Sequence, residues 1–157
     1  MIEINLLKDK MISGFLAGCI GALAMNIIDW IGYLAGFHQE QLLDWSGVLI
    51  YGSVPSGFAE TLFAQLAQIS FGGFIGITFY GFFLKWLKGN HFVKGWIYGI
   101  LSWFFIYAFS MLFDKPEMNF HAFPAAFSHF LSASVYGIVM SLALRWLEQG
   151  VARSSGK

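Results

Sequence analysis

Four long apolar stretches dominate this chain and decide what it can fold into. They cover residues 11–37, 58–84, 92–113 and 123–146, and each contains few charged side chains. A helix needs about 20 mostly apolar residues to cross the hydrocarbon core of a bilayer. The sequence therefore predicts an all-α, polytopic membrane protein with a bundle of four transmembrane helices. The whole chain, residues 1–157, is expected to form a single membrane domain.

The composition excludes an ordinary water-soluble domain. Hydrophobic residues make up 57% of the chain and charged residues only 11%, whereas soluble domains contain roughly 25% charged residues. The net charge is zero, so nothing in the composition points to nucleic acid. The single cysteine, Cys19, excludes an internal disulfide and any multi-cysteine metal site. We expect the partners to be the lipid bilayer and either further copies of this chain or other membrane subunits.

Lysine and arginine are distributed unevenly between the two sides of the predicted membrane domain. If the N-terminus is cytoplasmic, only Lys115 faces outward, and the other eight basic residues lie inside. Short cytoplasmic loops of membrane proteins carry an excess of lysine and arginine. The sequence therefore predicts that both termini are cytoplasmic. The inside residues are Lys8, Lys10, Lys85, Lys88, Lys94, Arg145, Arg153 and Lys157.

The connection between the first two spans, residues 38–57, is too polar at its ends to cross the membrane. Its middle, residues 42–51, is expected to form a short helix on the membrane surface, with Trp45 and Tyr51 at headgroup level. Pro124 falls in the first turn of the fourth span, where a proline is tolerated.

Small residues recur every four positions along each predicted span. Apolar side chains give no drive for helix association in lipid, so small residues and interhelical hydrogen bonds must provide it. Residues four apart share a helix face, so each span presents one small face to its neighbours. The predicted packing residues are Gly14, Gly18, Gly72, Gly76, Gly95, Gly99 and Gly137.

Polar residues on or beside these faces gather in the outer half of the predicted bundle. At 1.5 Å per residue, Asp29 lies about 10 Å and His129 about 9 Å below the outer ends of their spans. A charge at mid-membrane costs about 2.5–3.5 kcal/mol on insertion scales, so Asp29 needs a partner, a proton or water. His129 and Asn26 are the expected partners. The predicted polar site consists of Asp29, Asn26, Glu60, Gln65, Gln68 and His129.

Each of these residues has a structural interpretation beside the functional one. Asp29 supports both equally, because intramembrane ionisable groups mark functional sites but also fix helices together. Glu60 is favoured as an acid at a solvated helix N-terminus, where the helix dipole stabilises negative charge. For His129, Gln65 and Gln68, interhelical hydrogen bonding is the favoured interpretation.

Metal, haem and catalytic chemistry have little support in the sequence. No two-histidine helical motif such as HExxH is present, and the histidines form no pair at matching depth for haem. We therefore expect no metal, no cofactor and no catalytic residue. A hypothetical metal site would combine His121 and His129 with Asp29 and Glu60.

Several short motifs resemble those of a known group of proteins. They are Leu43-Asp44-Trp45, Ile50-Tyr51-Gly52, Lys94-Gly95-Trp96 and Ser134-Val135-Tyr136-Gly137. In these motifs, and over most of its length, the chain resembles uncharacterised small four-span membrane proteins of clostridia and related bacteria. The resemblance implies a bacterial cytoplasmic membrane and a four-helix fold, and it assigns no functional residue.

Two functions from different classes remain open at this point. The polar site favours a small channel or transporter, or a subunit of one, and four helices leave so little room for a pore that a homo-oligomer is expected. The alternative is an accessory protein that binds other membrane subunits through its glycine-rich helix faces. A membrane-embedded enzyme ranks third.

Overall fold

The structure, a computed structural model, describes residues 9–86, 89–112 and 123–155. This part of the chain is helical and contains no strand. Four segments are long and apolar enough to cross a membrane, which confirms the prediction of an all-α, multi-pass protein. The elements are α2 (Lys10–Leu34), α3 (Leu42–Tyr51), α4 (Phe58–Thr78), the π-helical segment η1 (Phe79–Phe83), α5 (Leu84–Trp86), α6 (His91–Leu112) and α7 (Phe123–Ser155).

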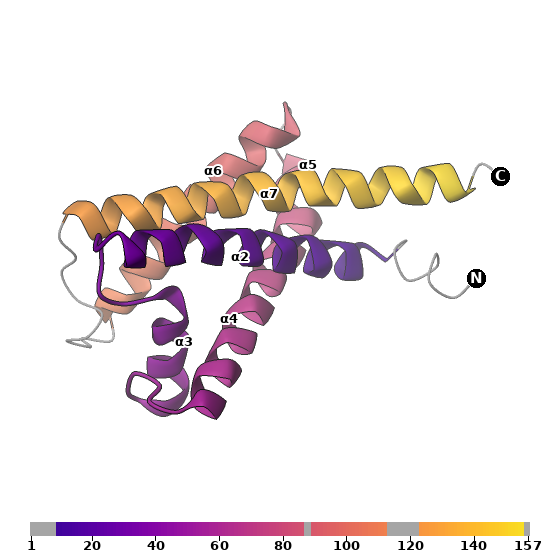
Figure 1. Ribbon diagram of the computed structural model, residues 1–157. Coiled ribbons are helices and arrows are strands. Elements are labelled where there is room, and N and C mark those ends of the chain that lie inside the picture. The colour runs from indigo at the N-terminus through magenta and orange to yellow at the C-terminus, as the bar shows by residue number, and fades with distance from the viewer. Residues whose placement is uncertain (1–8, 87–88, 113–122, 156–157) are drawn as a thin grey trace.

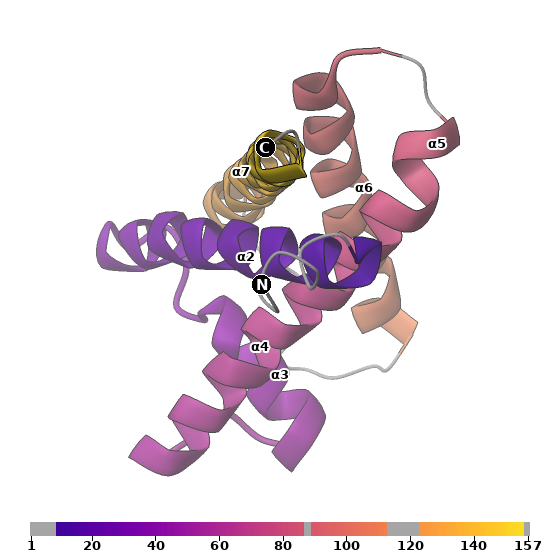
Figure 2. The same cartoon turned by 90° about the vertical axis from the view of Figure 1, so that its right-hand side faces the viewer.

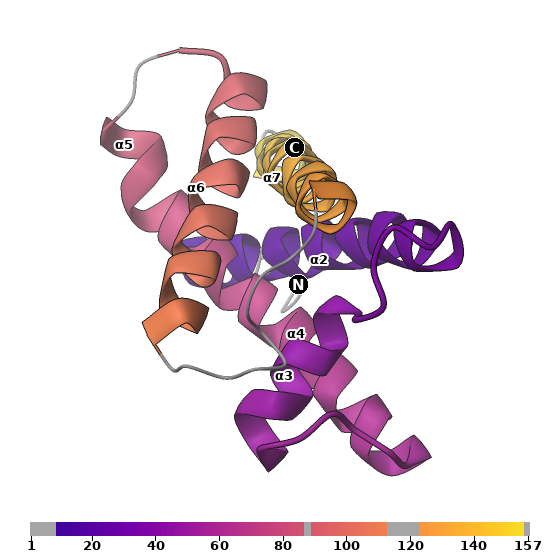
Figure 3. The ribbon, with the colours of Figure 1, turned by 90° about the vertical axis from the view of Figure 1, so that its left-hand side faces the viewer.

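The spanning helices cross one another obliquely (Figure 1). In Figures 2 and 3, α7 is seen nearly end-on, whereas α2 runs across both views. Helix α2 packs against α7 and α4, and α6 packs against α7. The end of α2, the end of α6 and the start of α7 gather near α3, and we call this region the α3 end. The start of α2 and the end of α7 lie at the opposite end (Figure 1).

The crossing of α2 and α4 depends on glycines from both helices. A Cβ atom at Gly18 would lie 2.3 Å from the carbonyl oxygen of Gly72, and one at Gly76 would lie 2.2 Å from that of Gly14. No carbon atom fits at these distances, so the two backbones are in direct contact. Such glycine-mediated crossings are a common way for helices to associate in membranes.

The crossing of α6 and α7 is built in the same way. A Cβ atom at Gly137 would lie 2.0 Å from the carbonyl oxygen of Gly95, and one at Gly99 would lie 2.4 Å from that of Ala133. The glycine faces predicted from the sequence are therefore used within this chain, α2 against α4 and α6 against α7.

The apolar core fills the space between these two crossings. The hydroxyl of Tyr136 on α7 donates a hydrogen bond of 2.7 Å to the carbonyl oxygen of Gly72 on α4, which joins the two crossings. Large phenylalanine and tryptophan side chains cover the outer surfaces of the helices, as expected of surfaces that face lipid. The buried core residues are Ala17, Ala22, Phe79, Tyr136, Met140, Leu144 and Leu147.

The first span is shorter than predicted. Helix α2 ends at Leu34 and not at Phe37, because Gly36 adopts a left-handed conformation with φ of 75°. Glycine reaches this conformation readily, and it commonly terminates helices. The amide of Phe37 then donates to the carbonyl of Gly32, so the chain folds back towards α2. The second and fourth spans extend beyond their predicted ends, to Trp86 and Val151. The third begins one residue early, at His91, and its predicted last residue, Phe113, lies outside the described residues.

Helix α3 has the predicted limits, Leu42–Tyr51. The packing of its Trp45 was not predicted from the sequence. The side chain packs inward on the ring of Tyr107 from α6, and the residue is only 7% exposed. Helix α3 therefore docks against the spans through Trp45.

Candidate functional site

Asp29 lies in the last part of α2 and is 3% exposed. Its Oδ2 accepts a hydrogen bond of 3.0 Å from the amide of Leu42, the first residue of α3. The N-terminus of a helix favours negative charge, so this carboxylate holds the start of α3 against α2. Within the described part of the chain, the other oxygen, Oδ1, has no hydrogen-bond partner.

His38 comes from the connection that folds back after α2, and it is 7% exposed. Its Nδ1 lies 2.6 Å from the carbonyl oxygen of Glu40, which can only accept a hydrogen bond. Nδ1 therefore carries the proton in the neutral ring, and Nε2 presents a lone pair. This Nε2 lies 3.6 Å from Oδ1 of Asp29, too far for a hydrogen bond.

His129 on α7 faces the same carboxylate oxygen from the other side. It is 1% exposed, and its Nε2 lies 3.7 Å from Oδ1 of Asp29. Its Nδ1 lies 2.6 Å from the hydroxyl of Tyr107 on α6. The ring of Trp45 stacks on Tyr107 and meets the ring of His129 edge-on. Helices α2, α3, α6 and α7 and the α2–α3 connection thus all contribute to one buried cluster.

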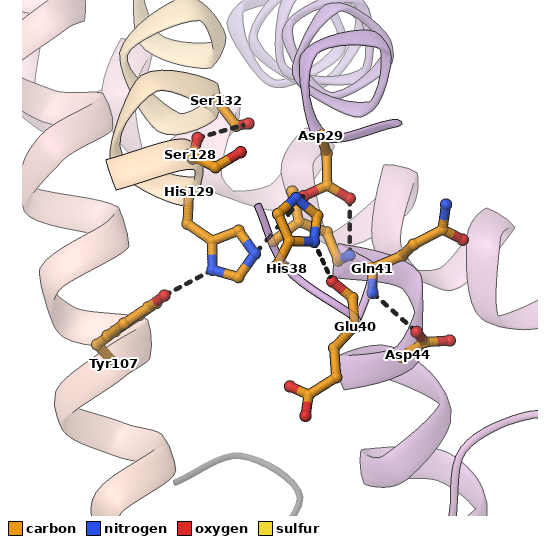
Figure 4. Close-up of polar contacts among 10 residues, drawn as sticks. Asp29, His38, Glu40, Gln41, Asp44, Tyr107, Ser128, His129 and Ser132 are labelled. Atoms are coloured by element: carbon orange, nitrogen blue, oxygen red, sulfur yellow. Dashed lines mark hydrogen bonds and ion pairs between the residues drawn. The ribbon is translucent and has the colours of Figure 1, made fainter. Parts of the chain in front are cut away.

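Figure 4 shows the Asp29 carboxylate facing the two imidazole rings. The three ligand atoms of Asp29, His38 and His129 lie within 4.8 Å of one another. We call these three residues the Asp-His-His cluster. For His38 and Asp29, a nitrogen lone pair points at an oxygen lone pair inside the protein. This arrangement is unfavourable unless a proton or a cation lies between the two atoms.

The distances from Asp29 to the two histidines are close to those of a transition-metal site. Zinc binds histidine nitrogen and carboxylate oxygen at about 2.0–2.2 Å, which separates two ligand atoms of a tetrahedral site by about 3.4 Å. The separations of 3.6 and 3.7 Å between Oδ1 of Asp29 and the two Nε2 atoms exceed this by a few tenths of an ångström. Metal-binding histidines typically use their second ring nitrogen to contact a carbonyl or another polar group. The Glu40 carbonyl and the Tyr107 hydroxyl occupy these positions.

Gly32 provides the space in which the cluster forms. A Cβ atom at this position would lie 2.2 Å from Oγ of Ser128 and 2.9 Å from Nε2 of His38. A larger residue would displace the Ser128 hydroxyl and press on the ring of His38.

The predicted polar site separates into three groups in the structure. Asp29 and His129 lie together, in the pairing expected from their depths. Asn26 and Gln65 both donate to Oε1 of Gln68, at 2.9 and 3.1 Å, in a group that joins α2 to α4. Glu60 lies apart at the start of α4, where its carboxylate accepts from the amide of Ser56 at 3.0 Å.

Two residues of the site were not predicted. His38 was placed in the outer connection, and Tyr107 was one aromatic residue among many in an apolar span. The pair of Gly32 and Gly36 is the signal that could have located His38, because Gly36 turns the chain back and Gly32 leaves room for a side chain. His121, which the sequence offered as a possible ligand, lies outside the described residues.

A cavity of about 390 Å³ adjoins the cluster, and His129 forms part of its wall. It lies between α3, α4, α6 and α7, and most of its lining is apolar. Tyr107, Trp45 and Gln68 also contact it.

Comparison of the chain with protein-family models, curated proteins and solved structures finds no significant match. The class of the protein is therefore described from its fold and its site alone. The chain is a multi-pass helical membrane protein with a buried Asp-His-His cluster next to an apolar cavity.

Proposed function

We propose that this protein binds a divalent transition-metal ion through Asp29, His38 and His129. The observation that carries the proposal is the convergence of three buried ligand atoms on one point. Oδ1 of Asp29 and Nε2 of His38 have no hydrogen-bond partner in the described chain. A buried polar atom without a partner costs about 1–3 kcal/mol. A cation bound between these atoms would offset that cost.

The ligand set favours particular ions. Two imidazoles and one carboxylate suit zinc, iron, cobalt or nickel, whereas calcium and magnesium prefer oxygen ligands alone. Structural zinc sites are usually closed by four protein ligands, and sites that exchange or activate a ligand keep one position open. A site with three protein ligands keeps one coordination position open. This supports a site that exchanges or activates a ligand over one that only stabilises the fold.

Metal titration of the purified protein in mild detergent tests this proposal. We expect one Zn²⁺ or Co²⁺ per chain, with Co²⁺ giving the absorption bands of a four-coordinate site. His38→Ala should lower the affinity by at least tenfold. His91→Ala, at the start of α6 and away from the cluster, is the matched control and should not change it. Unchanged affinity in His38→Ala, or no binding by the folded wild-type protein, would refute the proposal.

The orientation predicted from the sequence becomes part of this proposal. Lys10, Lys85, Lys94 and Arg145 belong to segments at the end opposite the α3 end, which supports a cytoplasmic location for that end. The Asp-His-His cluster would then face the outer side of a bacterial cytoplasmic membrane, where it could take up ions from outside the cell.

Ion transport is the second candidate function, and one observation favours it. The hydrogen-bonded group of Asn26, Gln65 and Gln68 lies on α2 and α4, and Asn26 is about one turn from Asp29 towards the middle of the membrane. This group therefore provides polar atoms between the Asp-His-His cluster and the middle of the membrane. The accessory role has less support, because the glycine faces that were expected to bind other subunits are filled within the chain. A partner or a second copy would have to use the phenylalanine-rich outer surfaces.

A further inference from the structure

We propose that the cavity beside the cluster binds the hydrocarbon chain of a single-chain amphiphile, with its carboxylate headgroup directed towards His129. The cavity holds about 390 Å³, within the range of about 300–1,000 Å³ that is usual for small-molecule sites. Its position between α3, α4, α6 and α7 is separate from the point on which the three cluster residues converge. The apolar part of the proposal is independent of metal binding, and the headgroup part rests on the proposed function.

The lining of the cavity identifies the chemical class of its occupant. Aromatic and aliphatic side chains provide most of its surface, and the polar groups are few. Water gains little in such a cavity, because it needs two to four polar partners to be stable. A hydrocarbon chain suits this lining. The principal apolar residues are Trp45, Phe71, Ile75, Trp103, Ile106 and Ala133.

The cavity also reaches the outer surface of the protein. Leu49, Phe71 and Phe109 line it and are at the same time 66%, 54% and 55% exposed. Phe71 and Phe109 belong to spanning segments, so this surface faces the hydrocarbon of the bilayer. A molecule dissolved in the membrane can therefore enter from the side without crossing water. This favours a lipid-like occupant over a water-soluble one.

The polar groups of the cavity determine the headgroup. Oε1 of Gln68 already accepts hydrogen bonds from Asn26 and Gln65. The amide nitrogen of Gln68 is then the group that can donate to a ligand. The side chains of His129, Tyr107, Ser46 and Ser102 are further polar groups of the lining. A headgroup with acceptor oxygens fits the Gln68 amide. A carboxylate would in addition be attracted towards His129 by a cation held in the Asp-His-His cluster.

Brominated fatty acid provides a direct test, because bromine quenches tryptophan fluorescence at contact and Trp45 and Trp103 line the cavity. We expect 9,10-dibromostearate to quench the purified protein in a saturable way, and stearate to reverse the quenching. Ser102→Phe fills the cavity from α6 and should abolish the saturable part. Leu101→Phe, on the adjacent exposed position, is the matched control and should leave it intact. Non-saturable quenching, or equal quenching in the two variants, would overturn the proposal.

Two further measurements separate this inference from the proposed metal function. Ser102→Phe should still bind Zn²⁺, which shows that the variant is folded. If Ser102→Phe fails to fold, competition by stearate for the wild-type protein still decides whether the cavity is occupied. His38→Ala should keep saturable binding but bind dibromostearate several-fold more weakly, while its methyl ester binds as before. If His38→Ala weakens the acid and the methyl ester equally, the carboxylate is not recognised through the cluster. Binding of the hydrocarbon chain in the cavity would still be supported.

Discussion

The hydroxyl of Tyr107 lies 2.6 Å from Nδ1 of His129 and so joins α6 to α7 behind the ring whose Nε2 faces Asp29. This contact sets the orientation of an imidazole that is almost completely buried. It also connects the proposed metal site to the cavity, since both residues line the cavity wall.

Removal of this hydroxyl should weaken metal binding without unfolding the protein. In Tyr107→Phe the ring can still stack on Trp45, but Nδ1 of His129 loses its contact. Loss of such supporting contacts usually lowers metal affinity by about 10–100-fold. Titration with Zn²⁺ measures the change, and Tyr51→Phe, on the exposed side of α3, serves as the control. An affinity equal to that of the wild type would mean that Tyr107 does not orient the ligand.

Gly32→Ala should disrupt the cluster from behind. The new methyl group would lie 2.9 Å from Nε2 of His38 and 2.2 Å from Oγ of Ser128. Overpacking of this kind costs about 1–3 kcal/mol, and His38 should move away from Asp29. We expect a lower thermal midpoint in detergent together with weaker Zn²⁺ binding. Gly81→Ala, where the methyl group would meet nothing within 4 Å, should change neither property.

Gly137→Ala tests the crossing of α6 and α7. The added carbon would lie 2.0 Å from the backbone oxygen of Gly95, and a backbone cannot give way as a flexible side chain can. The helices must separate, so we expect a loss of stability larger than that of Gly32→Ala. Thermal unfolding followed by circular dichroism compares the two variants directly. A stability equal to that of the wild type would show that the two backbones are not in contact.

Single-cysteine variants test the proposed orientation. With Cys19 replaced by alanine, a cysteine at Ser56 reports on the α3–α4 connection and one at Gly150 on the last turns of α7. A membrane-impermeant maleimide should label the Ser56→Cys variant in intact cells. It should label the Gly150→Cys variant only after permeabilisation. The reverse pattern would place the Asp-His-His cluster on the cytoplasmic side.

Asp29→Asn tests whether transport depends on the metal site. Asparagine keeps an oxygen that can accept from the amide of Leu42, so α3 should remain docked. It removes the negative charge that a metal ion needs, and uptake of Zn²⁺ into proteoliposomes should stop. A metal-sensitive dye inside the vesicles measures the flux. If the wild-type protein binds Zn²⁺ and carries none across, its site retains the ion and does not transport it.

The part of the site that lies on spanning helices could be predicted from the sequence. Helical periodicity and a fixed rise per residue give the depth and face of each position, and this places Asp29 near His129. His38 lies in a connection, whose path depends on the left-handed turn at Gly36 and on the space beside Gly32. Neither the turn nor the space follows a periodic sequence pattern. His38, the third member of the cluster, could therefore not be placed from helical periodicity.

The same limit applies to the packing of Trp45. A tryptophan in an amphipathic helix near the membrane usually lies at the interface, and the limits of α3 were predicted correctly on that basis. The ring turns inward because α3 docks over the ends of α6 and α7, where Tyr107 and His129 provide aromatic partners. That docking depends on contacts between segments distant in sequence, which residue patterns within one helix do not contain.

Helix α7 runs without interruption for 33 residues, from Phe123 to Ser155. This corresponds to about 50 Å, whereas the hydrocarbon core of a bilayer is about 30 Å thick. Even when it is strongly tilted, such a helix must leave the lipid before it ends. The last turns of α7, which carry Arg145 and Glu148, therefore lie beyond the hydrocarbon core, at the level of the headgroups or outside them.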